Sequence, residues 1–436
     1  MTTKIWQKTA SANIEHSAIV EKFTVGNDVA FDYVLAKFDV LGSLAHCEML
    51  HSIGLLTIEE WTVIETQLRI ILVEIAQDNF TISPGIEDIH SQVENLLIHR
   101  IGETGKKIHS GRSRNDQVLT DLKLYMKSEI KTIVEHTETL FNTLIQLSNQ
   151  HKNTLLPGYT HLQIAMPSSF GLWFGAYAES MVDDMELLLA AYNVTNKCPL
   201  GSGAGYGSSF PLDRQLTSDL LGFKMLNVNS VYAQMTRGKS EKVVAMAMSG
   251  ISATLSKFAY DMCLYLNQNF GFIAFPDTLT TGSSIMPHKK NPDVFEIIRA
   301  RTNRIQALPN ELILLTNNLP SGYHRDFQLI KEGLFPAIQS LKDCLTMFDF
   351  MLQHIEIKTN SVHDSKYDYM FSVESVNQQV VDGIPFREAY KNIGLAIENN
   401  LFEPNYNLQH SHIGSIGNLG NEQIEMAFAN IKKQFI

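Results

Sequence analysis

The stretch that decides the fold is DQVLTDLKLYMKSEIKTIVEHTETLFNTLIQL, residues 116–147. Apolar side chains recur along it at helical spacing, and neither proline nor glycine interrupts it. Such a segment predicts one helix of roughly 45–50 Å, because each helical residue adds about 1.5 Å. The same spacing recurs over residues 168–190, over residues 240–266 and after Pro292.

Several long helices without alternating strand patterns predict an all-α protein built around a central bundle. Some of these helices are apolar on more than one face, and partner subunits would bury such faces most simply. We therefore expect an obligate oligomer. Turn residues predict three regions: an N-terminal helical domain over 1–108, the long-helix bundle over 109–353, and a small C-terminal helical domain over 354–436.

Composition narrows the classes of partner. The formal net charge of -11 argues against nucleic acid as the main partner. No stretch approaches the roughly 20 apolar residues that cross a bilayer, and the first residues lack an apolar signal core. These observations predict a cytoplasmic protein without a membrane partner. Four cysteines far apart in sequence, without metal-ligand spacing, are expected to be buried thiols: Cys47, Cys198, Cys263 and Cys344.

Two polar segments surround the first long helix. HSGRSRNDQV, residues 109–118, places Arg112, Arg114 and Asn115 where the helix begins. Forked arginine donors at a helix start suit a dianionic small molecule, although a solvated loop capped by Asp116 fits the pattern equally. GYTHLQIAMPSSFG, residues 158–171, places His161 in a loop between two helices. Histidine suits proton transfer near neutral pH, but a lone histidine is more often structural.

Two further loops differ in whether they contain residues suited to catalysis. PLGSGAGYGSS, residues 199–209, lacks the Gly-Lys-Ser/Thr ending of a P-loop and follows no strand. It predicts a flexible loop or a close approach of the backbone. TGSSIMPHKKNPD, residues 281–293, joins two serines to a basic segment that opens a helix. A serine hydroxyl needs neighbouring positive charge to act as a base, and Lys289 with the following helix N-terminus can provide it.

Five ordered blocks resemble one family. GSSIMPHKKNP resembles the signature of the fumarase/aspartase superfamily of lyases. HSGRSRNDQV and LPGYTHLQ resemble two further shared segments in the form typical of the argininosuccinate lyase branch. YHRDFQLIK, residues 323–331, and GIPFREAY, residues 383–390, resemble two more. The resemblance implies a three-region helical fold whose central bundle forms a homotetrameric core, with active sites shared between subunits.

The resemblance also implies a reaction. A base removes the proton beside a carboxylate of a small dicarboxylate substrate, an aci-carboxylate forms, and the C–N bond breaks to release fumarate and arginine from argininosuccinate. No metal and no organic cofactor is needed, because charged side chains and helix ends supply the field. By the matching positions, Ser283 is the base, His161 is the proton donor or its activator, and Lys289 holds the carboxylate. The roles of Ser283 and His161 can also be reversed. The expected substrate-binding residues are Arg114, Asn115, Thr160, Asn291, Tyr323, Gln328 and Lys331.

Some positions depart from the family pattern. FTVGNDVAFD at residues 23–32 replaces a serine-containing stretch, and RGKSEKV at residues 237–243 replaces a segment with phenylalanine and acidic residues. His288 stands where glutamine is common, and Leu329-Ile330 replaces an acidic pair. Several of these positions are expected to contact the amino-acid half of the substrate. One hypothesis is therefore that the arginine half is N-acylated, which would remove a charge and add bulk.

Two alternatives stay open from the sequence. Adenylosuccinate lyase-type activity is slightly favoured by MPHK, although the segments at residues 109–118 and 323–328 favour argininosuccinate. A non-catalytic structural role is also found in this family, among proteins of the eye lens. Retention of the expected catalytic residues argues against such a role.

Overall fold

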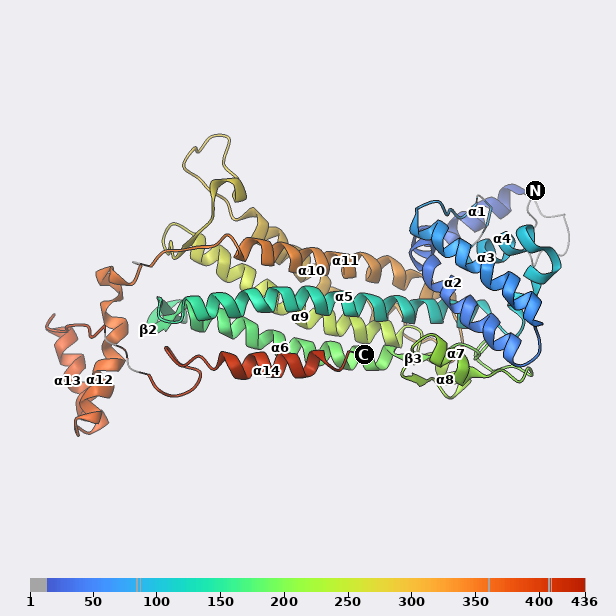
Figure 1. Cartoon of the computed structure of the whole chain (residues 1–436). Helices are drawn as coiled ribbons and strands as arrows, with labels where there is room; N and C mark the ends of the chain where they lie inside the picture. The colour runs from blue at the N-terminus through green and yellow to red at the C-terminus, as the bar shows by residue number, and fades with distance from the viewer. Residues whose placement is uncertain are drawn as a thin grey trace. The chain divides into compact units, whose positions relative to one another are not determined.

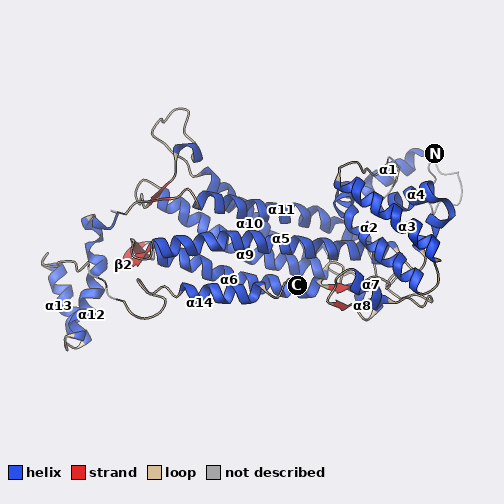
Figure 2. Ribbon diagram, viewed as in Figure 1, coloured by secondary structure: helices blue, strands red, loops and turns tan. Residues whose placement is uncertain are grey.

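The computed structural model describes residues 14–435 except positions 84, 87, 360, 407 and 409. The expectation for the first residues, 1–13, therefore lies outside the described residues. Helices make up most of the described chain, and strands are few and short (Figure 2). This confirms the all-α class.

The chain forms two compact units. The first contains residues 1–132, 188–249 and 305–339, and the second contains residues 133–187, 250–304 and 340–436. Five long helices contribute residues to both units, and their bounds confirm the four predicted runs. They are α5 (Arg114–Gln150), α6 (Phe170–Thr195), α9 (Lys239–Leu266), α10 (Asp293–Leu315) and α11 (Ile330–Leu352). The division into three regions stays a prediction.

The first unit has a core made by N-terminal helices. α2 (Asp28–Ser52) packs against α3 (Ile58–Ala76) and α4 (Ile89–Ile101) (Figure 1). α3 begins with a capping box, in which Thr57 and Glu60 satisfy each other's backbone amides. Apolar side chains from all three helices are fully buried between them. Smaller elements complete the unit: α1 (Ile14–Val25), the 3₁₀ helix η1 (Gly102–His109), α7 (Arg214–Leu220), α8 (Ser230–Met235) and η3 (Arg325–Leu329).

The second unit has an aromatic core. The ring of Phe258 stacks between Tyr177 and Phe348, at centroid distances of 4.0 and 4.5 Å. α14 (Asn421–Lys432) packs along α5, where Phe428 stacks on Phe141 at 4.1 Å. These contacts join α6, α9 and α11 to one another, and α5 to α14, through rings that bury large apolar areas. The unit also contains the 3₁₀ helices η2 (Asp277–Leu279), η4 (Ser361–His363) and η5 (Ser365–Phe371). Its remaining helices are α12 (Ser372–Val381) and α13 (Phe386–Glu398), and α13 begins directly after Pro385.

Three two-stranded sheets occur among the described residues. The longest is an antiparallel hairpin of β1 (Leu155–Thr160) and β2 (Gln163–Ser169). The sequence predicted only a loop here, because Pro157 pairs with Pro167 and a bulge interrupts the ladder, so strand alternation is hidden. The other pairs are β3 (Lys197–Cys198) with β4 (Met225–Leu226), and β5 (Ile273–Ala274) with β6 (Glu356–Ile357).

α9 is more apolar than expected. By length and composition alone it could cross a membrane, but 56% of its most apolar window is buried inside the protein. That burial is typical of a core helix. Three cysteines are buried, as predicted, whereas Cys263 on α9 is half-buried.

Candidate active site

In the loop at residues 281–293, the side chain of Ser283 lies beside two backbone amide donors. The Ser283 hydroxyl oxygen accepts hydrogen bonds from the amides of Ile285 and Met286, at 3.3 and 3.1 Å. A backbone bridge between Thr281 and Asn291 closes the base of the loop, and α10 begins at Asp293, directly after Pro292. Two amides aimed at one oxygen favour its deprotonated form. The geometry therefore suits a serine that must act as a base.

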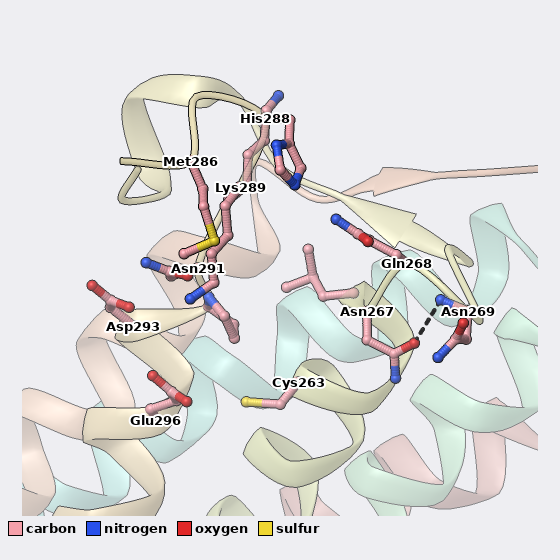
Figure 3. Close-up of a pocket in the computed structure, with 13 residues that line it drawn as sticks. Cys263, Asn267, Gln268, Asn269, Met286, His288, Lys289, Asn291, Asp293 and Glu296 are labelled. Atoms are coloured by element: carbon pink, nitrogen blue, oxygen red, sulfur yellow. Dashed lines mark hydrogen bonds between the residues drawn. The ribbon is translucent and has the colours of Figure 1, made fainter. Parts of the chain in front are cut away.

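A cavity of about 710 Å³ lies beneath this loop (Figure 3). Lys289 and Asn291 line it from the loop, and Glu296 lines it one turn into α10. Lys289 is exposed and forms no ion pair with any residue that the structure describes, so its charge is available to an anion. The remaining lining is mainly from the end of α9 and from the loop: Cys263, Leu266, Asn267, Gln268, Asn269, Met286, His288, Lys290, Pro292 and Asp293.

His161 occupies the tip of the β1–β2 hairpin. Both turn residues have left-handed backbone conformations, with φ of 54° at His161 and 59° at Leu162. This is the geometry of a tight hairpin turn that normally takes glycine or asparagine. A leucine there costs about 1 kcal/mol or more, and such strain is typical of functional positions. The side chain of Leu162 is 71% exposed, so packing does not explain the choice.

A second group of expected residues lies in the first unit. Lys331 on α11 is buried and contacts the carboxylates of Asp28 and Asp32, each at 2.6 Å. Gln328 donates to the carbonyls of Thr24 and Val25, at 3.0 and 3.1 Å. The altered N-terminal stretch at residues 23–32 therefore directly contacts the expected substrate-binding block.

The charges around Lys331 are unequal. Two carboxylates face one ammonium group. Burial raises the pKa of Asp28 to about 6 although Lys331 lies beside it, and the charge of Asp32 adds to the rise. When both carboxylates are ionised, they and the single ammonium group together carry a net negative charge. A cationic group of a ligand could neutralise this charge.

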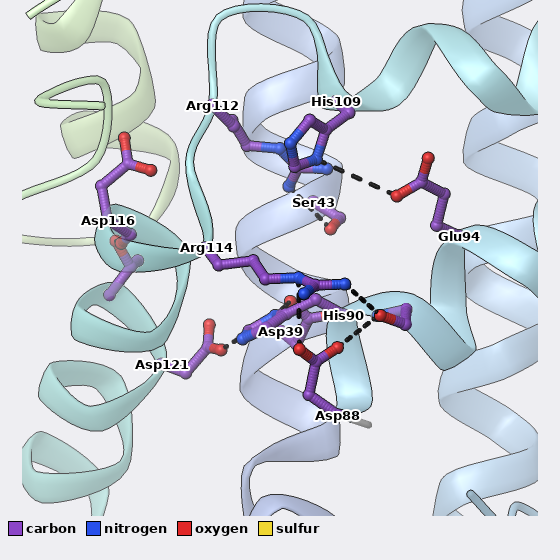
Figure 4. A network of polar contacts seen from close by, with 12 residues as sticks. Asp39, Ser43, Asp88, His90, Glu94, His109, Arg112, Arg114, Asp116 and Asp121 are labelled. Atoms are coloured by element: carbon purple, nitrogen blue, oxygen red, sulfur yellow. Dashed lines mark hydrogen bonds and ion pairs between the residues drawn. The ribbon is translucent and has the colours of Figure 1, made fainter. Parts of the chain in front are cut away.

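Arg114, at the start of α5, is held by the start of α4 (Figure 4). Its Nε lies 3.2 Å from Asp88, and its guanidinium donates to the Ser91 hydroxyl at 2.5 Å. Asp88 also caps α4, because its carboxylate accepts from the Ser91 amide at 2.8 Å. Neighbouring Arg112 is buried and donates to the Ser43 hydroxyl. Sequence reasoning missed Asp88, because its partner lies 26 residues away and no local pattern marks the pair.

His90, two residues after Asp88, is a buried histidine. His90 Nδ1 lies 2.6 Å from Asp39 and 3.8 Å from Asp121. Burial by itself lowers the pKa of His90, but Asp39, Asp121 and Asp88 together outweigh it and raise that pKa to about 10. His90 is therefore a buried cation at neutral pH, and it stabilises the carboxylate that holds Arg114.

The same three side chains are the group best placed to hold a metal ion in the described part of the chain. One potential ligand atom from each of Asp39, His90 and Asp121 lies within 4.8 Å of the others, and all three residues are buried. The short contact between His90 Nδ1 and Asp39 shows that a proton can occupy this position instead. That charge-assisted hydrogen bond engages His90 Nδ1 and one oxygen of Asp39, whereas Asp39 Oδ2, His90 Nε2 and Asp121 Oδ2 are buried without a hydrogen-bond partner among the described residues.

The His90 cluster predicts how stability depends on pH. The pKa of His90 rises from 6.5 in the unfolded chain to about 10 in the folded protein, so its stabilising contribution is full below about pH 6.5 and is lost as the pH rises toward 10. Asp121 acts in the same direction, because burial and Asp39 raise its pKa. We therefore expect the free energy of unfolding in urea to fall between about pH 6.5 and pH 8, below the range in which Lys123 and Lys127, whose pKa values burial lowers to about 8, act in the opposite direction.

Two variants test the cause. His90→Gln should show a clearly shallower pH dependence than the native protein over this range, because the titration of His90 is removed. His99→Gln, which changes an exposed histidine on the same helix, should keep the full dependence. Identical slopes for the native protein and His90→Gln would exclude His90 as the source.

The predicted residues divide between the two units. Arg114, Asn115, Tyr323, Gln328 and Lys331 belong to the first unit. The second unit contains Thr160, His161, Ser283, Lys289 and Asn291. Within the second unit, Lys289 and Asn291 share one cavity.

His161 and Ser283 line neither that cavity nor a second one of about 480 Å³ beside the hairpin. Asn269 lines both cavities. Of the residues that sequence reasoning missed here, Glu296 could have been found, since it follows the helix-opening Asn-Pro by one turn.

The family model that matches this chain, and two individual proteins similar to it, are lyases. The lyase family matches residues 11–307. Argininosuccinate lyase of Parabacteroides distasonis is 57% identical over 435 residues, which span 100% of this chain and 97% of that protein. Argininosuccinate lyase of Bacteroides thetaiotaomicron is 54% identical over the same shares of the two chains.

Solved structures show the same fold at low identity. A variant of EDDS lyase with bound fumarate superposes with a TM-score of 0.78, covering 98% of this chain and 91% of that one. The two sequences are 20% identical, so this likeness concerns the fold alone.

Proposed function

Because this chain belongs to the argininosuccinate lyase family, we propose that it cleaves the C–N bond of argininosuccinate by β-elimination, releasing fumarate and arginine in arginine biosynthesis. The observation that carries this proposal is the 57% identity to an argininosuccinate lyase over the whole of this chain and 97% of the relative. The substrate is a small dicarboxylate, and the site of action is cytoplasmic.

The loop at residues 281–293 supports the assignment of the base. Ser283 removes the proton beside the carboxylate, and the amides of Ile285 and Met286 stabilise its alkoxide. Lys289 and Asn291, which share a cavity, hold the aci-carboxylate as negative charge develops on it. Such stabilisation of developing charge is usually the largest contribution to catalysis.

The proton that leaves with the nitrogen comes from the hairpin. His161 donates it or activates its donor, and Thr160 binds the substrate beside it. The strained turn sets the backbone conformation from which the imidazole extends at the hairpin tip. In the reversed assignment, His161 is the base and Ser283 assists; the Ser283 hydroxyl with two amide donors favours the first assignment.

Residues of the first unit bind both halves of the substrate. Arg114 and Asn115 bind a carboxylate of the succinyl half, while Tyr323, Gln328 and Lys331 face the amino-acid half. The excess carboxylate of Asp28 and Asp32 over Lys331 favours a free ammonium or guanidinium group there. An N-acyl group would remove the ammonium charge, so plain argininosuccinate is favoured over its N-acylated forms.

The working enzyme is a homotetramer that builds each site from several subunits. The long helices leave large apolar side chains exposed on a single chain. Among them are Met246 on α9, Ile297 on α10 and Met347 on α11, which are 47, 55 and 43% exposed. Rows of apolar side chains on helices that also form the core are typical of subunit interfaces.

One assay tests the proposal. Fumarate release is followed by ultraviolet absorbance with four substrates: argininosuccinate, its N-acetyl form, its N-succinyl form and adenylosuccinate. We expect the highest kcat/KM with argininosuccinate. A higher value with an N-acyl form would overturn the assignment of the amino-acid half, a higher value with adenylosuccinate would overturn the branch, and no fumarate from any of them would overturn the activity.

A further inference from the structure

The glycine-rich loop at residues 199–209 has no role in the function proposed above, yet it is tied to the start of α5. Asp116 is fully buried, and its Oδ2 accepts hydrogen bonds from the amides of Gly201 and Gly203, at 3.0 and 2.8 Å. Its Oδ1 accepts from the amide of Ser113 at 2.9 Å. One carboxylate therefore joins two segments 85 residues apart, in addition to accepting from the amide at the start of α5.

The loop can reach Asp116 because it is made of glycine. Gly201 and Gly203 have φ of 82° and 59°, in the left-handed region. A Cβ on Gly201 would lie 2.8 Å from the side chain of Arg214. Arg214 also holds the loop, because it donates to the Leu200 carbonyl at 3.0 Å. The Asp116 carboxylate and the Arg214 guanidinium group therefore both hold the loop through hydrogen bonds.

The far end of the loop lies beside another part of the expected site. The side chain of Tyr206 is 74% exposed, and its hydroxyl lies 3.6 Å from where a Cβ on Gly322 would stand. Gly322 directly precedes Tyr323, one of the expected substrate-binding residues. The loop thus runs from the segment of Arg114 and Asn115, which directly precede Asp116 in sequence, to the segment that carries Tyr323.

We propose that Asp116 is a positioning residue, whose carboxylate sets the glycine-rich loop and thereby fixes the spacing between Arg114–Asn115 and Tyr323. This inference rests on the proposed function for its effect on substrate, but not for its effect on the loop. All three partners of the carboxylate are N–H donors, so both oxygens must accept and only the ionised form satisfies every donor. Arg112 and Arg214 are the charged groups that act on Asp116, and both favour its ionised form.

Protonation of the Asp116 carboxylate is expected to weaken its hold on the glycine-rich loop, as substitution of Asp116 would. Burial raises the pKa of Asp116 to about 6, while its amide donors and Arg112 oppose the rise. Below that pH the grip on the loop weakens. Global stability does not fall from this group, since a raised pKa means that the folded state binds the proton more tightly than the unfolded chain.

Hydrogen exchange of the full-length protein tests the inference without relying on activity. Asp116→Asn replaces one acceptor with an NH₂ group that faces amide donors. We expect amides in residues 199–209 to exchange at least about tenfold faster in this variant, as a lost buried hydrogen bond would allow. Asp213→Asn makes the same change at an exposed carboxylate that caps α7 in the same unit, where asparagine is also an accepted cap, and it should leave that loop unchanged. Unchanged exchange over residues 199–209 in Asp116→Asn would overturn the inference.

A second variant covers the possibility that Asp116→Asn does not fold. Gly203→Ala keeps Asp116 and the start of α5, but places a side chain at a φ of 59° with its Cβ 3.0 Å from the Gly207 carbonyl oxygen. With argininosuccinate as substrate, we expect KM to rise about tenfold while kcat changes much less, because binding geometry is lost and chemistry is spared. A fall in kcat with unchanged KM, or native kinetics despite a loosened loop, would contradict a positioning role.

Discussion

Replacing Ser283 with alanine is expected to lower kcat for fumarate release at least about a hundredfold, the range for residues in general acid–base catalysis. KM should change little, because the serine hydroxyl contributes to the transition state more than to substrate binding. The fold should persist, since the loop that carries Ser283 is exposed and its base is closed by Thr281 and Asn291. Steady-state kinetics and circular dichroism together measure both expectations.

The neighbouring serine provides the control. Ser284→Ala changes the same side chain one position along the exposed loop and should retain most of the native kcat. Near-native turnover in Ser283→Ala would remove that residue from the mechanism. Equal losses in both variants would point to disturbance of the loop rather than to loss of a base.

Replacing Lys331 with methionine is expected to reduce the free energy of unfolding by about 3–5 kcal/mol, because it leaves buried carboxylates without their cation. Lys331 has only 3% of its side chain exposed and contacts both Asp28 and Asp32. Equilibrium unfolding in urea measures the loss. Lys290→Met is the matched control, since it breaks an exposed ion pair with Asp277 and should change stability little.

A double variant separates the charge from the packing. Adding Asp32→Asn to Lys331→Met removes one of the two unpaired carboxylates, so it should recover part of the lost stability. If the double variant is as unstable as the sum of the two single changes, the carboxylates and the lysine do not act as a charged group. The account of the amino-acid half would then lose its electrostatic basis.

The long helices were predictable from sequence because their spacing is uninterrupted. α5 extends over Arg114–Gln150 where apolar periodicity predicted a helix, and α10 begins one residue after the proline that predicted its start. Recognition of the family from five short blocks is likewise confirmed by relatives that match along the whole chain. Local patterns of this kind depend on neighbours in sequence, so a single sequence displays them.

Contacts between distant segments were not predictable in the same way. Lys331 meets Asp32, a partner 299 residues earlier, and His90 meets Asp39 across 51 residues. Neither pair leaves a periodic or compositional mark. The replacement of a serine in the N-terminal stretch could be predicted from sequence, but the placement of Asp28 and Asp32 at Lys331 could not. Tertiary folding made the difference, because charge complementarity acts between groups that only the fold brings together.

The most direct test of the central claim is a mixing measurement with two inactive variants. Ser283→Ala and His161→Asn are each expected to release fumarate at about 1% of the native rate or less. If a site takes these two residues from different subunits, tetramers that contain both variants will include some sites with an intact serine and an intact histidine. Unfolding the variants together and refolding them should therefore produce such hybrids.

The rate of fumarate release from argininosuccinate is then compared before and after mixing. The account predicts a mixed sample at least about tenfold more active than either parent, because complete sites turn over normally while the parents supply only residual activity. Refolding Ser283→Ala with the double variant Ser283→Ala/His161→Asn should give no gain, since no site can then contain the serine. No recovery in the first mixture, from hybrids shown to contain both chains, would contradict a site built from several subunits.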